Sequence, residues 1–455
     1  MESIRIVHTN DLHSHFENWP VIRRYIERAQ KDETVSQTLT FDLGDFMDRS
    51  HPLTDATDGG INIELMNNVH YDGATIGNNE GIGNPHAILE HLFDHANFDI
   101  LLGNLFEQDG KRPAFCQPYK IITTKMGTRI AVLGLTAAYP LTYEPNGWDI
   151  HLITDVLPGL LAELRGQYDY LILLSHLGIT MDKYLANEFK ELNLIIGSHT
   201  HHLLENGLVV NQSMLAAAGK WGRYIGDIRL EFDVNHQLVQ QQVNTVKTAD
   251  LQTLPGDAKE IAGYVERGEA LLAHEHVATL PASYAAKKTE MADALHAIAQ
   301  TAGTNLAILN TGLFVQQLQP GLLTMNDLHQ GLPHPMHVVR VKLRGEDLWR
   351  LVMEMEKNRN FLRNFKIKGM SFRGKIFGEI KYLGIEVDQA TRTVYVEGQE
   401  IDTERDYYIA LLDHYVFIPF FPTIEIMGET KFYFPKFFRQ VVADYLSHKY
   451  KLEDE

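Results

Sequence analysis

The first half of the chain alternates short apolar runs with longer stretches of mixed polarity, and each run ends in polar residues or glycine. The apolar runs cover residues 4–9, 38–45, 98–105, 129–135, 170–178 and 192–200. Runs that are apolar at successive positions are typical of strands buried on both faces, in a sheet covered by helices. The pattern therefore predicts an α/β fold for this half.

The pattern changes between about residues 248 and 276, where charged residues surround one apolar stripe. Ile261, Val265, Leu271 and Leu272 lie along that stripe at broadly helical spacing. We interpret the segment as a helix that connects two domains. The predicted organisation is an N-terminal domain over residues 1–245, a connecting helix within 246–276 and a C-terminal domain over 277–455.

The second half mixes helical and strand patterns. Residues 289–303 predict a helix with Thr289 as its N-terminal cap, and residues 305–312 predict a buried strand. Residues 338–344 alternate apolar and basic side chains, which predicts a further strand that turns into a helix at Gly345.

Aromatic residues concentrate in two segments near the C-terminus, residues 415–422 and 431–438. We interpret these aromatic side chains as core. Pro419 and Pro422 argue against a central strand in the first segment, because proline cannot donate to a ladder of hydrogen bonds.

Length and charge narrow the classes of function. A chain of 455 residues favours two domains, and a net charge of −18 argues against a long basic surface for nucleic acid. No window approaches the roughly 18–20 apolar residues of a membrane helix, so we expect neither a nucleic-acid nor a membrane partner. The chain is predicted to be a monomer or a homodimer.

The N-terminus and the cysteine content predict a compartment. The first residues, MESIRIVHTND, lack the basic and apolar regions of a signal peptide. The single cysteine, Cys116, allows no disulfide within the chain and is interpreted as a small buried hydrophobic residue. Together these features predict a cytoplasmic protein.

Potential metal ligands gather at the ends of the predicted strands. They are Asp11, His13, Asp45, Asn78, His176, His199 and His201. Carboxylates, a carboxamide oxygen and imidazoles form a mixed set that suits Zn, Mn, Fe or Co better than Ca or Mg. Seven ligands exceed what one zinc ion needs but fit two divalent ions that share a bridging carboxylate.

The order of these motifs resembles that of the calcineurin-like metallophosphoesterases, and within them the 5′-nucleotidase family. The matching segments are NDLHSH, DLGD, GNNE, LLSHLG and GSHTHH, supported by KMGTRIAVLGL and AAGKWGRYIGDIRLEF. The specific motifs lie within residues 1–245. The resemblance implies a four-layer αββα sandwich followed by an α/β substrate-binding domain of the 5′-nucleotidase type.

The resemblance also implies a role for each ligand. Asp11, His13 and His201 would hold the first metal ion. Asn78, His176 and His199 would hold the second ion. Asp45 would bridge the two ions, and Asp42 would orient a ligand by hydrogen bonding.

The chain departs from the family directly after the metal-binding asparagine. The family has a histidine that contacts the phosphoryl group and an aspartate that orients it, whereas this chain has Asn79 and Ile82. Asn79, at the catalytic position, can donate a hydrogen bond but cannot deliver a proton. Losing a general acid typically costs on the order of 10²–10⁴ in rate.

Three interpretations of the missing histidine remain open. Another histidine could substitute, with His15, His51, His86 and His202 as candidates. Alternatively, the substrate's leaving group needs little protonation, or the protein binds without turnover. Asn79 could also be a turn residue that tolerates unusual backbone angles.

The C-terminal domain carries a weaker match to the family. Asn310 and Gly312 match the substrate-binding motif, but Phe314 or Val315 occupies the position of its arginine. The two aromatic side chains that would stack on the base fall near His334 and Tyr415.

The resemblance predicts a two-metal phosphohydrolase acting on nucleotides through metal-activated hydroxide. The alternatives are a phosphodiesterase or pyrophosphatase for cyclic nucleotides or nucleotide diphosphate derivatives, and a weakly catalytic, metal-loaded nucleotide binder.

Overall fold

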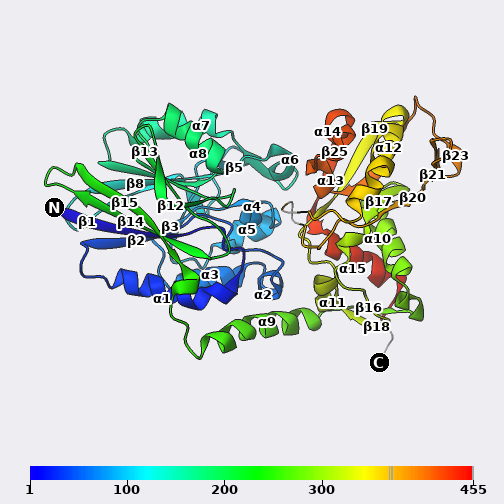
Figure 1. Ribbon diagram of the computed structural model, residues 1–455, viewed down its shortest axis with the longest axis horizontal. Coiled ribbons are helices and arrows are strands. Elements are labelled where there is room, and N and C mark those ends of the chain that lie inside the picture. The colour runs from blue at the N-terminus through cyan, green and yellow to red at the C-terminus, as the bar shows by residue number, and fades with distance from the viewer. Residues whose placement is uncertain (368, 370–371, 453–455) are drawn as a thin grey trace. The chain divides into compact units, whose positions relative to one another are not determined.

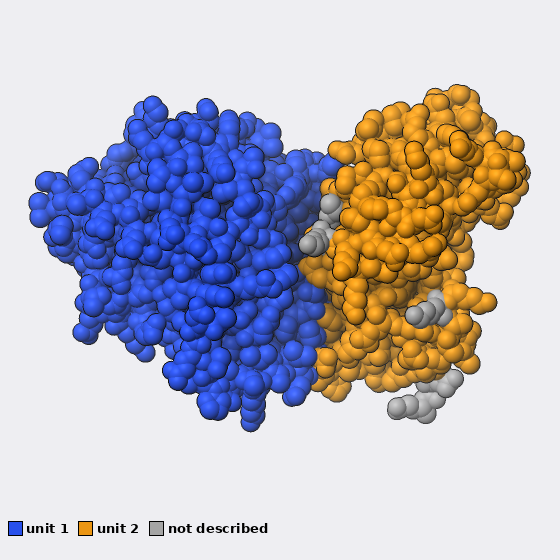
Figure 2. Space-filling model, viewed as in Figure 1, with its two compact units in different colours: residues 1–268 blue, residues 269–455 orange. Residues whose placement is uncertain are grey.

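The computed structural model describes residues 1–367, 369 and 372–452, shown as a ribbon in Figure 1. The chain divides into two compact units, residues 1–268 and 269–455, which Figure 2 colours separately. The dividing line falls inside α9 (Asp257–Ala273), within the segment predicted to connect two domains. In the described part of the chain, no helix has both the length and the apolar character needed to cross a membrane.

A mixed seven-stranded sheet forms one layer of unit 1. Its strands, in spatial order, are β15 (Leu238–Lys247), β14 (Tyr224–Phe232), β1 (Glu2–Thr9), β2 (Gln37–Asp42), β3 (Gly73–Ala74), β4 (Asp99–Leu101) and β6 (Cys116–Gln117). Strands β1, β2, β3, β4 and β6 are parallel to one another. Along them, Thr9 pairs with Asp42, which pairs with Ala74. This register brings the loops after β1, β2 and β3 to one edge of the sheet.

A six-stranded sheet forms a second layer of unit 1. Its strands, in spatial order, are β12 (Leu203–Val210), β13 (Ser213–Ala218), β11 (Leu194–Gly197), β10 (Tyr170–His176), β8 (Arg129–Thr136) and β7 (Tyr119–Thr123). Strands β8, β10 and β11 are parallel, so their carboxyl ends also share one edge. Strands β5 (Leu105–Glu107) and β9 (Trp148–Ile150) form a separate pair.

Helices cover the outer face of each sheet. The first sheet packs against α1 (Trp19–Gln30), α3 (Gly60–Asn67) and α5 (His86–Leu92), and the second against α7 (Ile153–Leu164) and α8 (Ile179–Glu188). The remaining helices of this unit before α9 are short: η1 (Phe16–Asn18), α2 (Pro52–Ala56), α4 (Asn78–Gly81), α6 (Pro140–Tyr143) and η2 (Thr248–Asp250).

Alternation along the strands explains why both faces of each sheet are apolar. On β10, Ile172 and Leu174 face the core between the sheets, while Leu171 and Leu173 face the helices. The four-layer αββα sandwich expected from the sequence is therefore confirmed.

Unit 2 is built on a five-stranded sheet, which confirms the predicted second α/β domain. Its strands, in spatial order, are β20 (Ile380–Leu383), β17 (Leu306–Asn310), β24 (Asp406–Leu412), β19 (His337–Arg344) and β25 (Glu429–Phe437). Two smaller sheets contain β16 (His276–Leu280) and β18 (Gly321–Thr324), and β21 (Ile385–Asp388), β22 (Thr393–Val396) and β23 (Gln399–Glu400). The helices are η3 (Ala282–Ala285), α10 (Lys287–Ala302), η4 (Thr311–Leu313), α11 (Met325–Gly331), α12 (Gly345–Leu362), α13 (His414–Phe417), α14 (Pro422–Met427) and α15 (Phe438–Lys449).

Two predictions for unit 2 were wrong. The α10 helix begins before Thr289, whose backbone N–H donates to the Ala286 carbonyl and whose hydroxyl donates to the Ser283 carbonyl, so Thr289 is not the cap. The aromatic residues near the C-terminus are not all core, because Phe417 is 47% exposed. The predicted absence of a central strand in residues 415–422 was right, because α13 ends at Phe417 and α14 begins at Pro422.

Cys116 lies on β6 and packs against the core between the first sheet and its helices. Burial raises the pKa of its thiol to about 12. It was interpreted from the sequence as a small buried hydrophobic residue; in the structure it packs against the core but is only partly buried.

Candidate metal centre

The candidate ligands lie at the carboxyl ends of parallel strands from both sheets of unit 1. Asp11 and His13 follow β1, Asp45 follows β2, Asn78 begins α4 after β3, His176 ends β10, and His199 and His201 follow β11. Open α/β sheets bind ligands at this edge.

The backbone at this edge is unusual. The φ angles of Asp11, His13, Asp45, His199 and His201 are all positive, between 49° and 71°. Such angles are uncommon for residues other than glycine and cluster at functional sites. The His13 N–H donates to the Asp45 carbonyl at 2.8 Å, which helps to hold two of these residues in place.

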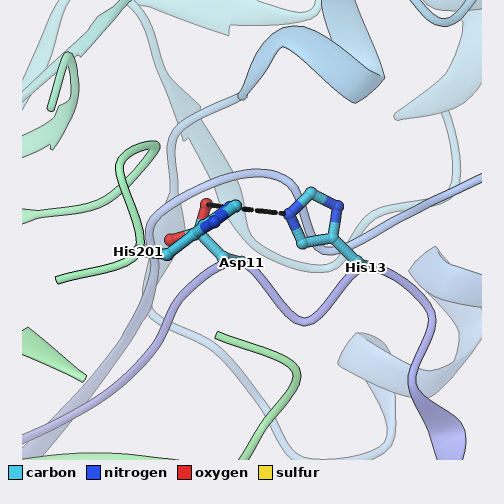
Figure 3. Close-up of side chains that lie close together, drawn as sticks. All are labelled: Asp11, His13 and His201. Carbon is cyan, nitrogen blue, oxygen red and sulfur yellow. Dashed lines mark hydrogen bonds and ion pairs between the residues drawn. The ribbon is translucent and has the colours of Figure 1, made fainter. Parts of the chain in front are cut away.

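Three candidate ligands converge on one point (Figure 3). The Nε2 atoms of His13 and His201 lie 3.2 Å apart, and Oδ1 of Asp11 lies 4.0 Å from the first and 3.6 Å from the second. These three ligand atoms lie within 4.8 Å of one another. They are the residues that the sequence predicts for the first metal ion.

Asp45 lies between this group and His176. Its Oδ2 atom is 3.7 Å from His13 Nε2 and 3.5 Å from His176 Nε2. Asp11, Asp45 and His176 form a second group whose ligand atoms lie within 4.8 Å of one another. A carboxylate in this position is suited to bridge two ions.

Two buried polar atoms give an independent test of whether metal ions fit here. Within the described residues, Asn78 Oδ1 and His176 Nε2 are buried and have no hydrogen-bond partner. Leaving such atoms unpaired is costly, and a cation removes that cost. A Cβ atom at Gly77 would lie 2.1 Å from Asp45 Oδ1 and 2.5 Å from His176 Cε1, so glycine leaves this space open. The residues fit divalent metal ions.

Two of the histidines use Nδ1 for contacts within the protein. His176 Nδ1 donates to the Leu43 carbonyl at 2.7 Å, which leaves Nε2 available to bind a metal ion. His13 Nδ1 lies 2.8 Å from the carboxamide nitrogen of Asn79. A metal-binding imidazole usually engages a second protein group through its other nitrogen, as these rings do.

The charges of the site are strongly coupled. Burial opposes ionisation of Asp45, but the His176 and His13 imidazoles lower its pKa below the ordinary value. Burial opposes protonation of His176, yet Asp45 raises its pKa to about 10. Burial and neighbouring cations lower the pKa of His199 to about 4 and that of His201 to about 3. The last two rings therefore keep free lone pairs at neutral pH.

Glu80, which is not among the ligands predicted from the sequence, connects two of the loops. Its buried carboxylate accepts backbone hydrogen bonds from Asp45 at 2.9 Å, Gly77 at 2.8 Å and Met47 at 3.1 Å. It is the last residue of the GNNE segment, so its position in the motif was a signal for this role.

Tyr139 was also missed. It lies after β8, at the N-terminus of α6, and its hydroxyl is 2.7 Å from His199 Nε2. No spacing or motif around Tyr139 could have identified it.

Asp42 contacts the loops rather than a candidate ligand. Its carboxylate accepts hydrogen bonds from the Thr9 hydroxyl at 2.6 Å and from the Gly44 N–H at 2.9 Å. The predicted hydrogen bond to a ligand side chain does not occur in the described structure.

The histidines suggested as substitutes for the family's catalytic histidine have other local partners. His15 contacts Glu17 at 2.6 Å, His86 contacts Glu107 at 3.0 Å, and His202 contacts Thr200 at 2.9 Å. His51 accepts a hydrogen bond from the Leu53 N–H at 3.2 Å, at the start of α2. Substitution by one of them stays a prediction.

Three of the predicted substrate residues of unit 2, Asn310, His334 and Tyr415, are buried, and Gly312 is partly exposed. Asn310 Oδ1 accepts hydrogen bonds from Tyr415 at 2.9 Å and His414 at 3.2 Å. His334 Nε2 lies 2.7 Å from the Leu313 carbonyl, and its ring stacks on Phe372.

Packing accounts for Gly312 and for the rings. A Cβ atom at Gly312 would lie 1.8 Å from the Ile376 carbonyl oxygen, so the close packing there requires glycine. The side chains of His334 and Tyr415 are fully buried, and neither ring offers an open face. Their role in stacking on a base stays a prediction.

Comparison with known proteins gives two family matches. Residues 4–203 match the family model described as calcineurin-like phosphoesterase, and residues 277–417 match the one described as 5′-nucleotidase, C-terminal domain. The chain is 37% identical over 463 residues to the uncharacterized metallophosphoesterase YunD of Bacillus subtilis, covering 97% of this chain and 98% of that one.

Solved structures share the fold at low sequence identity. A putative 5′-nucleotidase from Staphylococcus aureus aligns with a TM-score of 0.69 and 16% identity, covering 98% of this chain and 97% of that one. The NAD nucleotidase of Haemophilus influenzae aligns with a TM-score of 0.64 and 15% identity, covering 98% and 96%.

Proposed function

Because this chain belongs to the 5′-nucleotidase family of calcineurin-like metallophosphoesterases, we propose that it hydrolyses phosphate esters of nucleotides with two divalent metal ions. The observation that carries the proposal is a pair of buried ligand atoms. Within the described residues, Asn78 Oδ1 has no hydrogen-bond partner, and His176 Nε2 makes no hydrogen bond and lies 3.5 Å from Asp45 Oδ2. They lie in a unit where the Nε2 atoms of His13 and His201 also face each other at 3.2 Å.

We assign the ligands as the sequence predicts. Asp11, His13 and His201 would hold one ion, Asn78, His176 and His199 the other, and Asp45 would bridge them, with Zn, Mn, Fe or Co as the metals. When bound, such ions lower the pKa of water and neutralise phosphoryl oxygens. Glu80 and Asp42 keep the loops fixed, so the ligand atoms need little rearrangement.

A nucleotide substrate is supported by the match of residues 277–417 to the 5′-nucleotidase C-terminal domain. Asn310, Gly312, His334 and Tyr415 would form the nucleoside site, which requires the two buried rings to become accessible. We further propose that the protein acts in nucleotide catabolism. The cytoplasmic location and the monomeric or homodimeric state stay predictions from the sequence.

The contact of Asn79 with His13 favours a second candidate function. A carboxamide held at an imidazole does not provide a proton for a leaving group. Substrates that need little protonation, such as nucleotide diphosphate derivatives, cyclic nucleotides or activated esters, are therefore the alternative. A weakly catalytic, metal-loaded nucleotide binder is the remaining alternative.

A hydrolysis screen tests the proposal. The chain is assayed with Mn²⁺ or Co²⁺ on nucleoside mono-, di- and triphosphates, cyclic nucleotides and p-nitrophenyl phosphate, alongside His199→Ala and the control His91→Ala, whose side chain is 69% exposed. We expect metal-dependent turnover that His199→Ala abolishes and His91→Ala preserves. Tight nucleotide binding without turnover of any substrate would exclude the enzyme, and full activity of His199→Ala would exclude the assigned metal site.

A further inference from the structure

The Tyr139 hydroxyl makes a direct contact with one of the candidate metal ligands. Its oxygen lies 2.7 Å from His199 Nε2, and the two rings are tilted by 50° with centroids 5.9 Å apart. Tyr139 is 40% exposed, so its ring lies at the protein surface rather than in the core.

This contact uses one nitrogen of the His199 ring and leaves the other available. In the structure as described, Nδ1 of His199 has no hydrogen-bond partner. The ring lies 5.1 Å from that of His176, the other imidazole assigned to the second ion. A neutral imidazole that binds a metal through one nitrogen carries its proton on the other. His199 can therefore bind a metal ion through Nδ1 while Nε2–H donates to the Tyr139 oxygen.

Two other candidate histidines also use one ring nitrogen for a contact within the protein. His176 is held through Nδ1 by the Leu43 carbonyl, and His13 is held through Nδ1 by Asn79. The His199 backbone is also held, because its N–H donates to Asp11 Oδ1 at 3.1 Å. Tyr139 thus adds, for the ring of His199, the constraint that Leu43 supplies for His176.

We propose that Tyr139 is a positioning residue that fixes the tautomer and orientation of His199 and thereby sets the affinity of the second metal ion. The inference rests on the proposed two-metal function and assigns a residue outside the ligand set. Loss of such an outer partner typically weakens metal binding about 10–100-fold. Tyr139 does not need to touch the substrate in this role.

Metal titration tests the inference without relying on activity. The metal-free chain, Tyr139→Phe and the matched control Tyr184→Phe are titrated with Co²⁺ by calorimetry and visible absorption. Tyr184 lies on α8 and is 44% exposed, close to the exposure of Tyr139. Phenylalanine keeps the ring and removes only the hydroxyl. His199→Ala identifies which of the two binding phases belongs to the second ion.

We expect Tyr139→Phe to weaken that one phase by about tenfold and to leave the other phase unchanged. Tyr184→Phe should bind both ions as the unmodified chain does. The melting temperature of metal-free Tyr139→Phe should match that of the unmodified chain. A purely structural role of the hydroxyl would instead make it lower. Excess metal should restore the kcat of Tyr139→Phe.

Each contrary result has its own meaning. If Tyr139→Phe binds both ions normally, the inference is overturned and the proposed function stands. If kcat stays low at saturating metal, Tyr139 acts on the reaction rather than by positioning, which also overturns the inference. If the unmodified chain binds no second ion, the two-metal function falls and the inference falls with it. If it binds two ions but hydrolyses nothing, only the proposed function falls.

Discussion

At the scale of single residues, Asn79 contacts a candidate metal ligand, whereas the family has a histidine that contacts the phosphoryl group at this position. Its carboxamide faces His13 Nδ1, and its backbone N–H donates to Asp45 Oδ1 at 2.8 Å. If His13 binds an ion through Nε2, Nδ1 carries the proton. That nitrogen also lies 3.5 Å from Asp48 Oδ2, and Asn79 accepts its proton only by presenting its carbonyl oxygen. A carboxamide can turn end over end to do so, because its oxygen and nitrogen occupy similar positions.

Two substitutions distinguish accepting from donating at Asn79. Asn79→Asp keeps two acceptor oxygens, so we expect it to retain metal affinity within a few-fold. Asn79→Leu is similar in volume but has no acceptor, and should weaken the first ion about tenfold. Equilibrium dialysis with Mn²⁺ measures both. Equal weakening by the two substitutions would mean that Asn79 donates to His13, which contradicts binding through His13 Nε2.

The sequence could predict most of the candidate ligands because they lie at the ends of apolar runs that are recognisable as strands. Asn78 follows the two-residue strand β3 and is recognised by the GNNE segment instead. Parallel pairing then places Asp11, Asp45 and Asn78 at one edge, as the register of β1, β2 and β3 shows. Tyr139 and the Leu43 carbonyl could not be predicted, since a hydroxyl in an irregular loop and a backbone oxygen leave no periodic signal.

At the scale of elements, strands β1 and β14 enclose a histidine that lies outside the candidate ligand set. His8 pairs with Gly226 in the antiparallel register, and a Cβ atom at Gly226 would lie 1.8 Å from His8 Nε2. Glycine on β14 therefore makes room for the ring. The imidazole is fully buried, and burial lowers its pKa from 6.5 to about 4, with Asp227 opposing the shift.

This packing predicts a loss of stability in acid. Between pH 6.5 and 4 the unfolded chain binds a proton at His8 that the folded chain excludes, so folding weakens as the pH falls through that window. The shift corresponds to about 3 kcal/mol of unfolding free energy. Urea unfolding of the metal-free chain at pH 7 and pH 4.5 measures the loss, and His8→Gln should show a loss smaller by about 2–3 kcal/mol. An identical pH dependence in both proteins would contradict the assignment.

Element boundaries were harder to predict than the elements themselves. The 18-residue helix α12 begins at Gly345 as predicted, because its apolar residues repeat at helical spacing directly after an alternating strand. The start of α10 was missed because η3 leads into it and Thr289 bonds within that turn. Local hydroxyl contacts of this kind resemble caps in sequence.

At the scale of the whole molecule, the candidate metal ligands and the predicted nucleoside residues belong to different units. Every candidate ligand lies within residues 1–268, and Asn310, Gly312, His334 and Tyr415 lie within residues 269–455. The identity of the substrate could not be predicted, because Phe314 or Val315 replaces the family's arginine and buried rings occupy the stacking positions.

This division predicts two responses to metal in calorimetry. A ligand stabilises the folded unit that binds it by an amount that grows with its concentration. We expect Co²⁺ or Mn²⁺ to raise the melting temperature of one transition and leave the other unchanged, with EDTA reversing the effect. His176→Ala should lack the part of the shift that comes from the second ion. Equal shifts of both transitions would show that the two units unfold together.

The burial of Cys116 has a practical consequence for fluorescence spectroscopy. With a pKa of about 12, its thiolate population at pH 8 is roughly a thousandfold smaller than that of an exposed cysteine. Maleimide dyes react with the thiolate, so a cysteine introduced on the surface of either unit would be labelled selectively in the otherwise unmodified chain. The natural sequence is in this sense already a low-background host for a dye attached to either unit.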